Sequence, residues 1–251
     1  ALIDAEILVV AANEGIKPQT REHLMALKAK KVEKLIVIQN KIDLVNIEQA
    51  KKSHKEIREF LGEEFKKAPI IPVSAQQEVN INEILKEIVL TPIPKREINK
   101  EPIFIIARSF DINRPGTLAK DLHGAVLGGS LKQGTLKIGQ EIEIKPGLVK
   151  KEYNETRYIS IKTKISSLYK GSKKVPELTP GGSMSIETEL DMTLGKNDAL
   201  GGNVAAPIGA LPELKKEIKL KYTLFPKVYG ASTEAKVEEI KKGETLMLSI
   251  N

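Results

Sequence analysis

Two short groups of polar residues follow apolar runs and carry side chains suited to hydrogen bonding with a flat ring. The first group is Asn40-Lys41-Ile42-Asp43, directly after the apolar run 35–39. A carboxylate such as that of Asp43 accepts two hydrogen bonds, which guanine offers from its N1–H and its 2-amino group. Adenine offers neither, and an unpaired charged acceptor costs on the order of 1–3 kcal/mol. The residue types therefore predict selection of guanine over adenine.

The second group, Ser74-Ala75-Gln76, follows the apolar run 69–73. A small residue here lets a backbone N–H approach guanine O6, while the Ser74 hydroxyl holds the loop. In the first group, the Asn40 amide either bonds the far edge of the purine or ties neighbouring loops together. The Lys41 stem is suited to lie across the base. The alternative is that both groups are simple polar turns. We predict no catalytic and no metal-ligating residue, and a nucleotide site formed by Asn40, Lys41, Ile42, Asp43, Ser74, Ala75 and Gln76.

The first hundred residues alternate predicted strands and helices, which indicates an α/β parallel sheet. The strands are predicted at 6–12, 35–39 and 69–73, and the helices after Pro18, at 48–61 and after Asn80. The continuous apolar runs are typical of strands buried on both faces. Asn80, with Glu83 three residues later, indicates a capping box. Because ligands of open α/β sheets bind at the carboxyl ends of the strands, both polar groups have a suitable place.

After the proline-containing linker 91–96 the pattern changes to short strands with glycine turns, which is typical of an all-β barrel or sandwich. These strands are predicted at 103–107, 124–127, 134–138, 141–144, 159–168 and 183–187. Asn197-Asp198 is interpreted as a simple turn. Residues 217–225 and 244–250 are predicted strands of part of a second β-barrel. We therefore expect domains at 1–97, 98–210 and 211–251.

Composition excludes several classes of protein. The 251 residues include no Cys, which excludes disulfide scaffolds, thiol nucleophiles and Cys-based zinc sites. No apolar run reaches the ~18–20 residues of a membrane span, and from the first residues we expect no signal peptide. We therefore expect a cytoplasmic location and no membrane partner. The net charge of +7 permits an anionic partner such as RNA.

These residues resemble those of translational GTPases. Residues 40–43 with 74–75 are similar to guanine-specificity elements, and residues 18–23 to a segment that translational GTPases carry at this place. The chain most resembles the gamma-subunit family of archaeal and eukaryotic translation initiation factor 2, through residues 9–14, 39–43, 108–116, 128–130 and 144–147. Residues 124–128 also suit the second-domain barrel of elongation factor Tu.

The resemblance implies the C-terminal part of a P-loop GTPase-type domain, followed by β-barrels. It implies binding of GTP and GDP with Mg²⁺, and a heterotrimer with alpha and beta subunits. It also implies delivery of initiator methionyl-tRNA to the small ribosomal subunit, with GTP hydrolysis triggering release. Arg108, Arg114 and Lys132 fall on the second domain, where they are candidates for tRNA contact without a matched motif.

The sequence departs from the family at the phosphate site. It contains no G-x-x-x-x-G-K-[ST] loop and no Asp-x-x-Gly switch ahead of the first strand. We therefore expect a fragment that reads the base, whose Mg²⁺ ligands lie outside this chain, and which does not hydrolyse GTP alone. Two alternatives remain: a non-catalytic docking scaffold for partner subunits or RNA, and an elongation factor-type carrier of aminoacyl-tRNA.

Overall fold

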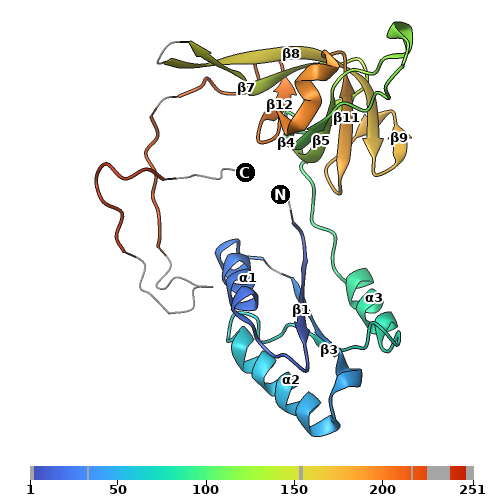
Figure 1. Cartoon of the computed structure of the whole chain (residues 1–251), viewed down its shortest axis with the longest axis vertical. Helices are drawn as coiled ribbons and strands as arrows, with labels where there is room; N and C mark the ends of the chain where they lie inside the picture. The colour runs from blue at the N-terminus through green and yellow to red at the C-terminus, as the bar shows by residue number, and fades with distance from the viewer. Residues whose placement is uncertain (1–2, 33, 153–154, 216, 225–237, 247–251) are drawn as a thin grey trace. The chain divides into compact units, whose positions relative to one another are not determined.

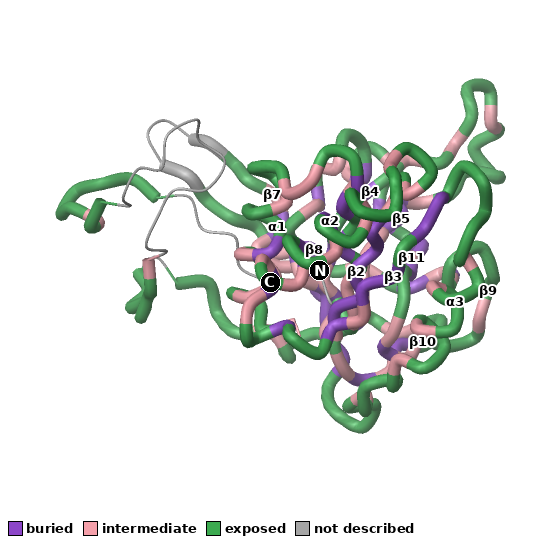
Figure 2. Tube along the Cα trace, turned by 90° about the horizontal axis from the view of Figure 1, so that it is seen from below, coloured by how far each residue is buried: buried purple, intermediate pink, exposed green. Residues whose placement is uncertain are grey.

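The computed structural model describes residues 3–32, 34–152, 155–215, 217–224 and 238–246. The chain forms two compact units, one that includes residues 3–94 and one that includes residues 95–219. Many of the buried residues lie in the strands (Figure 2). Among the described residues, no helix has both the length and the apolar character needed to cross a membrane.

The N-terminal unit is built on a three-stranded parallel sheet with the order β1-β2-β3, as predicted. The strands are β1 (Glu6–Ala11), β2 (Leu35–Asn40) and β3 (Ile70–Pro72). The helices are α1 (Pro18–Ala29), α2 (Ile47–Leu61) and α3 (Ile81–Val89). The central strand β2 is buried along its whole length except at its last residue, which explains its continuous apolar run.

Helices cover both faces of this sheet (Figure 1). Leu24 of α1 and Ile57 of α2 pack with Val37 in one apolar core. On the other face, α3 packs against β2 and β3, where Ile84 lies beside Ile38. The predicted site residues follow the carboxyl ends of β2 and β3, which pair in parallel and so end at the same edge of the sheet.

The prediction that the first strand, β1, is buried on both faces is wrong. Leu8 and Val10 face the core, but Ile7 is 44% exposed and Val9 is 55% exposed. The reason is topological, because β1 is an edge strand and α3 covers only β2 and β3. The apolar run thus predicts that β1 is a strand, but not which strands and helices pack against it.

The second unit contains a closed β-barrel. Six strands form the ring β11-β5-β4-β12-β7-β8, and pairing of β8 with β11 closes it. The barrel strands are β4 (Ile103–Phe110), β5 (Val126–Gln133), β7 (Glu141–Glu152), β8 (Glu155–Lys170), β11 (Met184–Thr188) and β12 (Val204–Pro207). The short strands β6 (Leu136–Lys137), β9 (Lys173–Val175) and β10 (Glu177–Leu178) add to its rim. The centre is filled by fully buried side chains such as Phe104, Ile144 and Leu168.

Strand β5 does not end where the sequence predicts. We expected a strand over 124–127, yet β5 runs from Val126 through Gly128 and Gly129 to Gln133. A Cβ at Gly129 would lie 2.0 Å from the carbonyl oxygen of Ile105. The glycine therefore serves close approach of two strands rather than a turn, beside an irregularity in the β4–β5 register between Ile106 and Arg108.

The two strands predicted near the C-terminus are not found in the described residues. Residues 217–224 and 244–246 form no strand there, while residues 225 and 247–250 lie outside the described part of the chain. A strand needs a backbone partner for its hydrogen bonds, and no described segment pairs with these residues. The domain boundaries 1–97, 98–210 and 211–251 stay a prediction.

Candidate functional site

The predicted site residues lie in two loops at the carboxyl edge of the N-terminal sheet. The Asn40 loop (residues 40–46) joins β2 to α2, and the Ser74 loop (residues 74–80) leads from β3 to α3. The Asn40 loop ends in a capping box that we did not predict from the sequence. Asn46 Oδ1 accepts from Gln49 N at 2.8 Å, and Gln49 Oε1 accepts from Asn46 N at 3.1 Å. Both ends of this loop are thus fixed, one by the strand and one by the helix cap.

Asn40 joins the neighbouring loops. Its backbone oxygen accepts a hydrogen bond from Ala12 N at 2.7 Å, and its side-chain Oδ1 accepts from Ala75 N at 3.1 Å. A third bond, from Ile42 N to Val73 O at 3.2 Å, lies alongside. Of the two roles predicted for the Asn40 amide, the structure contains the loop-tying one. Since Oδ1 of Asn40 already accepts this hydrogen bond, its Nδ2 group is the one available to donate to a ligand.

The Ser74 loop is held by its own hydrogen bonds. Ser74 is buried, its hydroxyl accepts from Gln77 N at 3.2 Å, and its carbonyl accepts from Val79 N at 3.0 Å. Ala75 and Gln76 are exposed at the tip. Because the Ala75 N–H donates to Asn40, the next donor along the chain, the Gln76 N–H, is the one available to a base oxygen.

The predicted capping box at Asn80 is wrong. Asn80 has a left-handed backbone with φ 61°, and its side chain makes no hydrogen bond to the helix that it precedes. Its Nδ2 donates instead to Pro72 O at 2.8 Å, across the base of the Ser74 loop. The residue therefore closes the loop rather than capping α3, a choice that spacing alone does not reveal.

Asp43 and Lys41 differ in how they are held. Asp43 lies exposed in a 3-10 turn (Ile42–Leu44), and among the described residues its carboxylate has no hydrogen-bond or ion-pair partner. Lys41 has a left-handed backbone with φ 62°, and its Nζ lies 2.8 Å from Oε1 of Glu14. This hydrogen bond to Lys41 holds the pKa of the Glu14 carboxyl below its ordinary value. Sequence reasoning did not single out Glu14, and its place in the family-like segment 9–14 was the available signal.

A depression of about 340 Å³ lies beside these loops, between the loop after β1, the 3-10 turn and α2. Glu14, Leu44 and Glu56 are among its lining residues. None of the residues predicted to bind the purine lines it. Glu14 lines this depression and also contacts Lys41 of the predicted site.

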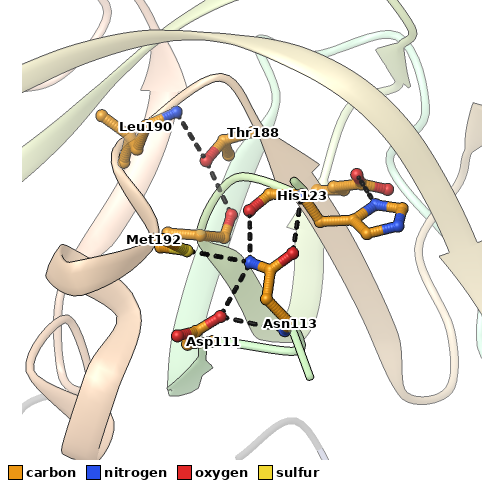
Figure 3. A network of polar contacts seen from close by, with 8 residues as sticks. Asp111, Asn113, His123, Thr188, Leu190 and Met192 are labelled. Atoms are coloured by element: carbon orange, nitrogen blue, oxygen red, sulfur yellow. Dashed lines mark hydrogen bonds and ion pairs between the residues drawn. The ribbon is translucent and has the colours of Figure 1, made fainter. Parts of the chain in front are cut away.

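A second polar cluster lies in the barrel unit and centres on Asn113 (Figure 3). Asn113 Nδ2 donates to His123 O at 2.7 Å, and its Oδ1 accepts from His123 N at 2.8 Å. Nδ2 also contacts Asp111 Oδ1 at 2.8 Å and the sulfur of Met192 at 3.1 Å. One side chain thus closes the loop between β4 and β5. Hydrogen bonds from Asn113 also hold the pKa of Asp111 below its ordinary value.

Replacing Asn113 by Ala is expected to open this loop and to lower the free energy of unfolding by about 1–3 kcal/mol, because the His123 backbone groups lose their partners. Hydrogen exchange of residues 114–123 and urea unfolding measure the two effects. Thr117→Val is a matched control, because Thr117 Oγ1 makes one exposed bond, to Arg114 O. Equal exchange in both variants would contradict the closing role of Asn113.

His123 and Glu187 form a pair at the edge of a pocket of about 360 Å³. Nδ1 of His123 lies 2.6 Å from Oε1 of Glu187, whose side chain is 10% exposed, against 53% for His123. The buried carboxylate orients the ring, as is usual for a histidine with one fixed nitrogen. The pocket is also lined by Ser166 and Leu190.

Asp198 and its partner Arg108 correct one interpretation of the sequence. Asp198 is not part of a simple turn, because its carboxylate accepts from Nε of Arg108 at 3.1 Å and from the backbone N–H of Ser109 at 3.1 Å. These bonds hold the pKa of Asp198 below its ordinary value, chiefly through Arg108. Arg108, a candidate for tRNA contact, also lies over the ring of Phe110. Its guanidinium is thus oriented by Asp198 and Phe110 while its side chain stays 64% exposed, and the role in tRNA contact stays a prediction.

Comparison with known proteins finds similarity to translation factors, including a GTP-binding domain in the N-terminal unit. Residues 1–94 match the family described as elongation factor Tu GTP binding domain. Residues 216–251 match the family described as initiation factor eIF2 gamma, C terminal. Translation initiation factor 2 subunit gamma of Methanococcus maripaludis is 47% identical over 253 residues, which cover 100% of this chain and 62% of that protein. The corresponding subunit of Aeropyrum pernix is 45% identical, with 61% of its length covered.

Over its whole length the chain is thus similar to translation initiation factor 2 gamma subunits. It spans about 62% of the length of the Methanococcus relatives that it matches. The fold is similar to that of translation elongation factor SelB from Methanococcus maripaludis, with a TM-score of 0.65 and 23% identity. That similarity covers 82% of this chain and 40% of SelB, and it concerns the fold.

Proposed function

We propose that this chain is the guanine-reading and barrel part of a GTP-binding translation initiation factor subunit. The observation that carries the proposal is the hydrogen bond from Ala75 N to Asn40 Oδ1, which ties the two predicted base-contacting loops together. Three groups then suit guanine: the free Asp43 carboxylate for N1–H and the 2-amino group, the Gln76 N–H for O6, and the Asn40 Nδ2 for the far edge. The similarity to these proteins supports the same ligand, GTP or GDP.

The proposed biological role is to carry initiator methionyl-tRNA to the small ribosomal subunit, in a heterotrimer with alpha and beta subunits. GTP hydrolysis would trigger release of the tRNA. The family resemblance also implies Mg²⁺, but among the described residues no group of three or more His, Asp or Glu side chains could hold a metal ion. We therefore assign no residue of this chain to the metal.

Direct binding distinguishes this role from its alternatives. In the complete protein that contains these residues, we expect GDP to bind more tightly than ADP, and initiator methionyl-tRNA more tightly than elongator tRNAs in the presence of a GTP analogue. Equal binding of both tRNA classes would favour an elongation factor-type carrier, which the match to the elongation factor Tu domain also allows. Loss of tRNA preference together with equal binding of GDP and ADP would favour a docking scaffold.

The 251-residue chain alone is expected not to hydrolyse GTP. Phosphoryl transfer depends on positioning of the phosphates and on metal electrostatics, and the sequence contains no G-x-x-x-x-G-K-[ST] loop. Phosphate release from GTP measures the activity, with the complete protein as the positive control. Turnover by the purified 251-residue chain above the buffer rate would refute the expectation.

A further inference from the structure

The ion pair between Lys41 and Glu14 joins two loops that the sequence separates by 27 residues. The Lys41 Nζ lies 2.8 Å from Glu14 Oε1, and both side chains are half-exposed. Such a pair at a protein surface contributes little to stability, because water screens it and both long side chains must be held in place. Its position next to the Asn40 loop points to a role in ligand binding rather than in folding.

The backbone around Glu14 is fixed without help from Lys41. Glu14 N and Gly15 N both donate to Ala11 O, at 3.2 and 2.9 Å, and Gly15 has the positive φ of 69° that this turn requires. The same turn is tied to β2 by the bond from Ala12 N to Asn40 O at 2.7 Å. Glu14 is therefore presented on a rigid turn at a set distance from the Asn40 loop.

Lys41 is the member of the pair that needs to be held. Its backbone is left-handed, which sets the starting direction of the side chain, but its four-carbon stem is flexible. A free lysine side chain loses much rotamer freedom when it packs along a flat ligand, and this loss weakens binding. A carboxylate that already holds the ammonium removes part of that loss.

We propose that Glu14 is a positioning residue of the purine site, which holds the Lys41 ammonium so that the Lys41 stem forms a ready wall for the base. The inference rests on the proposed function, because it assumes that the Asn40 and Ser74 loops bind guanine. Glu14 touches the lysine and not the ligand. The opposite role, in which Glu14 competes with the nucleotide for Lys41, predicts an effect of opposite sign.

The test is a titration of GDP into the complete protein that contains these residues, by calorimetry. Glu14→Gln is expected to weaken GDP binding about 3- to 10-fold, since the ordering of Lys41 then opposes binding. Lys41→Met keeps an unbranched stem without the ammonium and is expected to cause a similar loss. The double variant is expected to lose no more than either single variant, which shows that the two residues act as one unit.

Glu56→Gln is the matched control, because Glu56 lines the same depression as Glu14, is exposed and makes no ion pair with Lys41. It removes the same charge and should leave GDP affinity unchanged, which separates positioning from general electrostatics. Equal or tighter GDP binding by Glu14→Gln would overturn the inference, as would additive losses in the double variant. Failure of the unaltered protein to prefer GDP over ADP would instead overturn the proposed function.

Discussion

Replacement of Asp43 by Asn is expected to weaken GDP binding by at least about 100-fold while leaving the fold intact. At the position of the new amino group, the variant loses a hydrogen bond to a charged acceptor, which contributes about 1.5–3 kcal/mol, and sets a donor against a donor of guanine. The hydrogen bond at the remaining oxygen becomes a neutral one, and about 1.4 kcal/mol corresponds to a tenfold change in affinity. Folding should not change, because Asp43 is exposed and its carboxylate has no partner among the described residues. Calorimetric titration of GDP and a thermal unfolding curve measure the two quantities.

The chemistry of the base provides a sharp control for this prediction. Asn presents an amino donor where Asp presents an oxygen, so the variant should prefer a purine that has a carbonyl at C2. We therefore expect xanthosine diphosphate to bind Asp43→Asn more tightly than GDP does, and the unaltered protein to show the reverse order. Unchanged GDP affinity in the variant would remove Asp43 from the site and with it the guanine assignment.

Gly129→Ala is expected to lower the free energy of unfolding of the barrel by about 3 kcal/mol. The added Cβ would lie 2.0 Å from Ile105 O and 3.1 Å from the Phe104 ring, in a region where Phe104 is fully buried. The backbone of β4 cannot move aside without breaking the β4–β5 pairing. Urea unfolding monitored by circular dichroism measures the loss as a lower midpoint.

Gly171→Ala is the control that separates the cost of a steric clash between strands from the cost of a positive φ. Gly171 has a φ of 60°, and an added Cβ would meet no atom within 4 Å, so its substitution carries only the cost of a left-handed alanine, about 1–2 kcal/mol. We expect this variant to be clearly more stable than Gly129→Ala. Equal unfolding midpoints, or a Gly129→Ala protein as stable as the unaltered one, would show that β4 and β5 can separate at this point.

Much of the N-terminal unit can be predicted because its signals are local. Continuous apolar runs indicate the three strands, Pro18 marks the start of α1, and the polar groups after β2 and β3 indicate the site. What cannot be predicted depends on neighbours in space. The exposure of Ile7 and Val9 follows from the edge position of β1, and the Asn80 side chain turns toward Pro72 O because the Ser74 loop brings that oxygen near.

The barrel is harder to predict because its strands are defined by pairing rather than by composition. The glycines of β5 favour a turn by residue type, although Gly129 in fact allows β4 to approach. Strand β12 has no clear signal in the sequence, since its short stretch Val204–Pro207 gains its strand character by bridging β4 and β7. Asp198 resembles a turn residue because its partner Arg108 lies 90 positions earlier in the chain.

The bonds made by Asn40 have a thermodynamic consequence for any ligand that docks at this edge. Asn40 links the segments after β1, β2 and β3 by hydrogen bonds. Because these segments are already fixed, little backbone conformational entropy is lost when a ligand binds there. The binding site is preorganised in the free protein. The association rate should therefore be limited by diffusion and side-chain adjustment rather than by closure of a disordered segment.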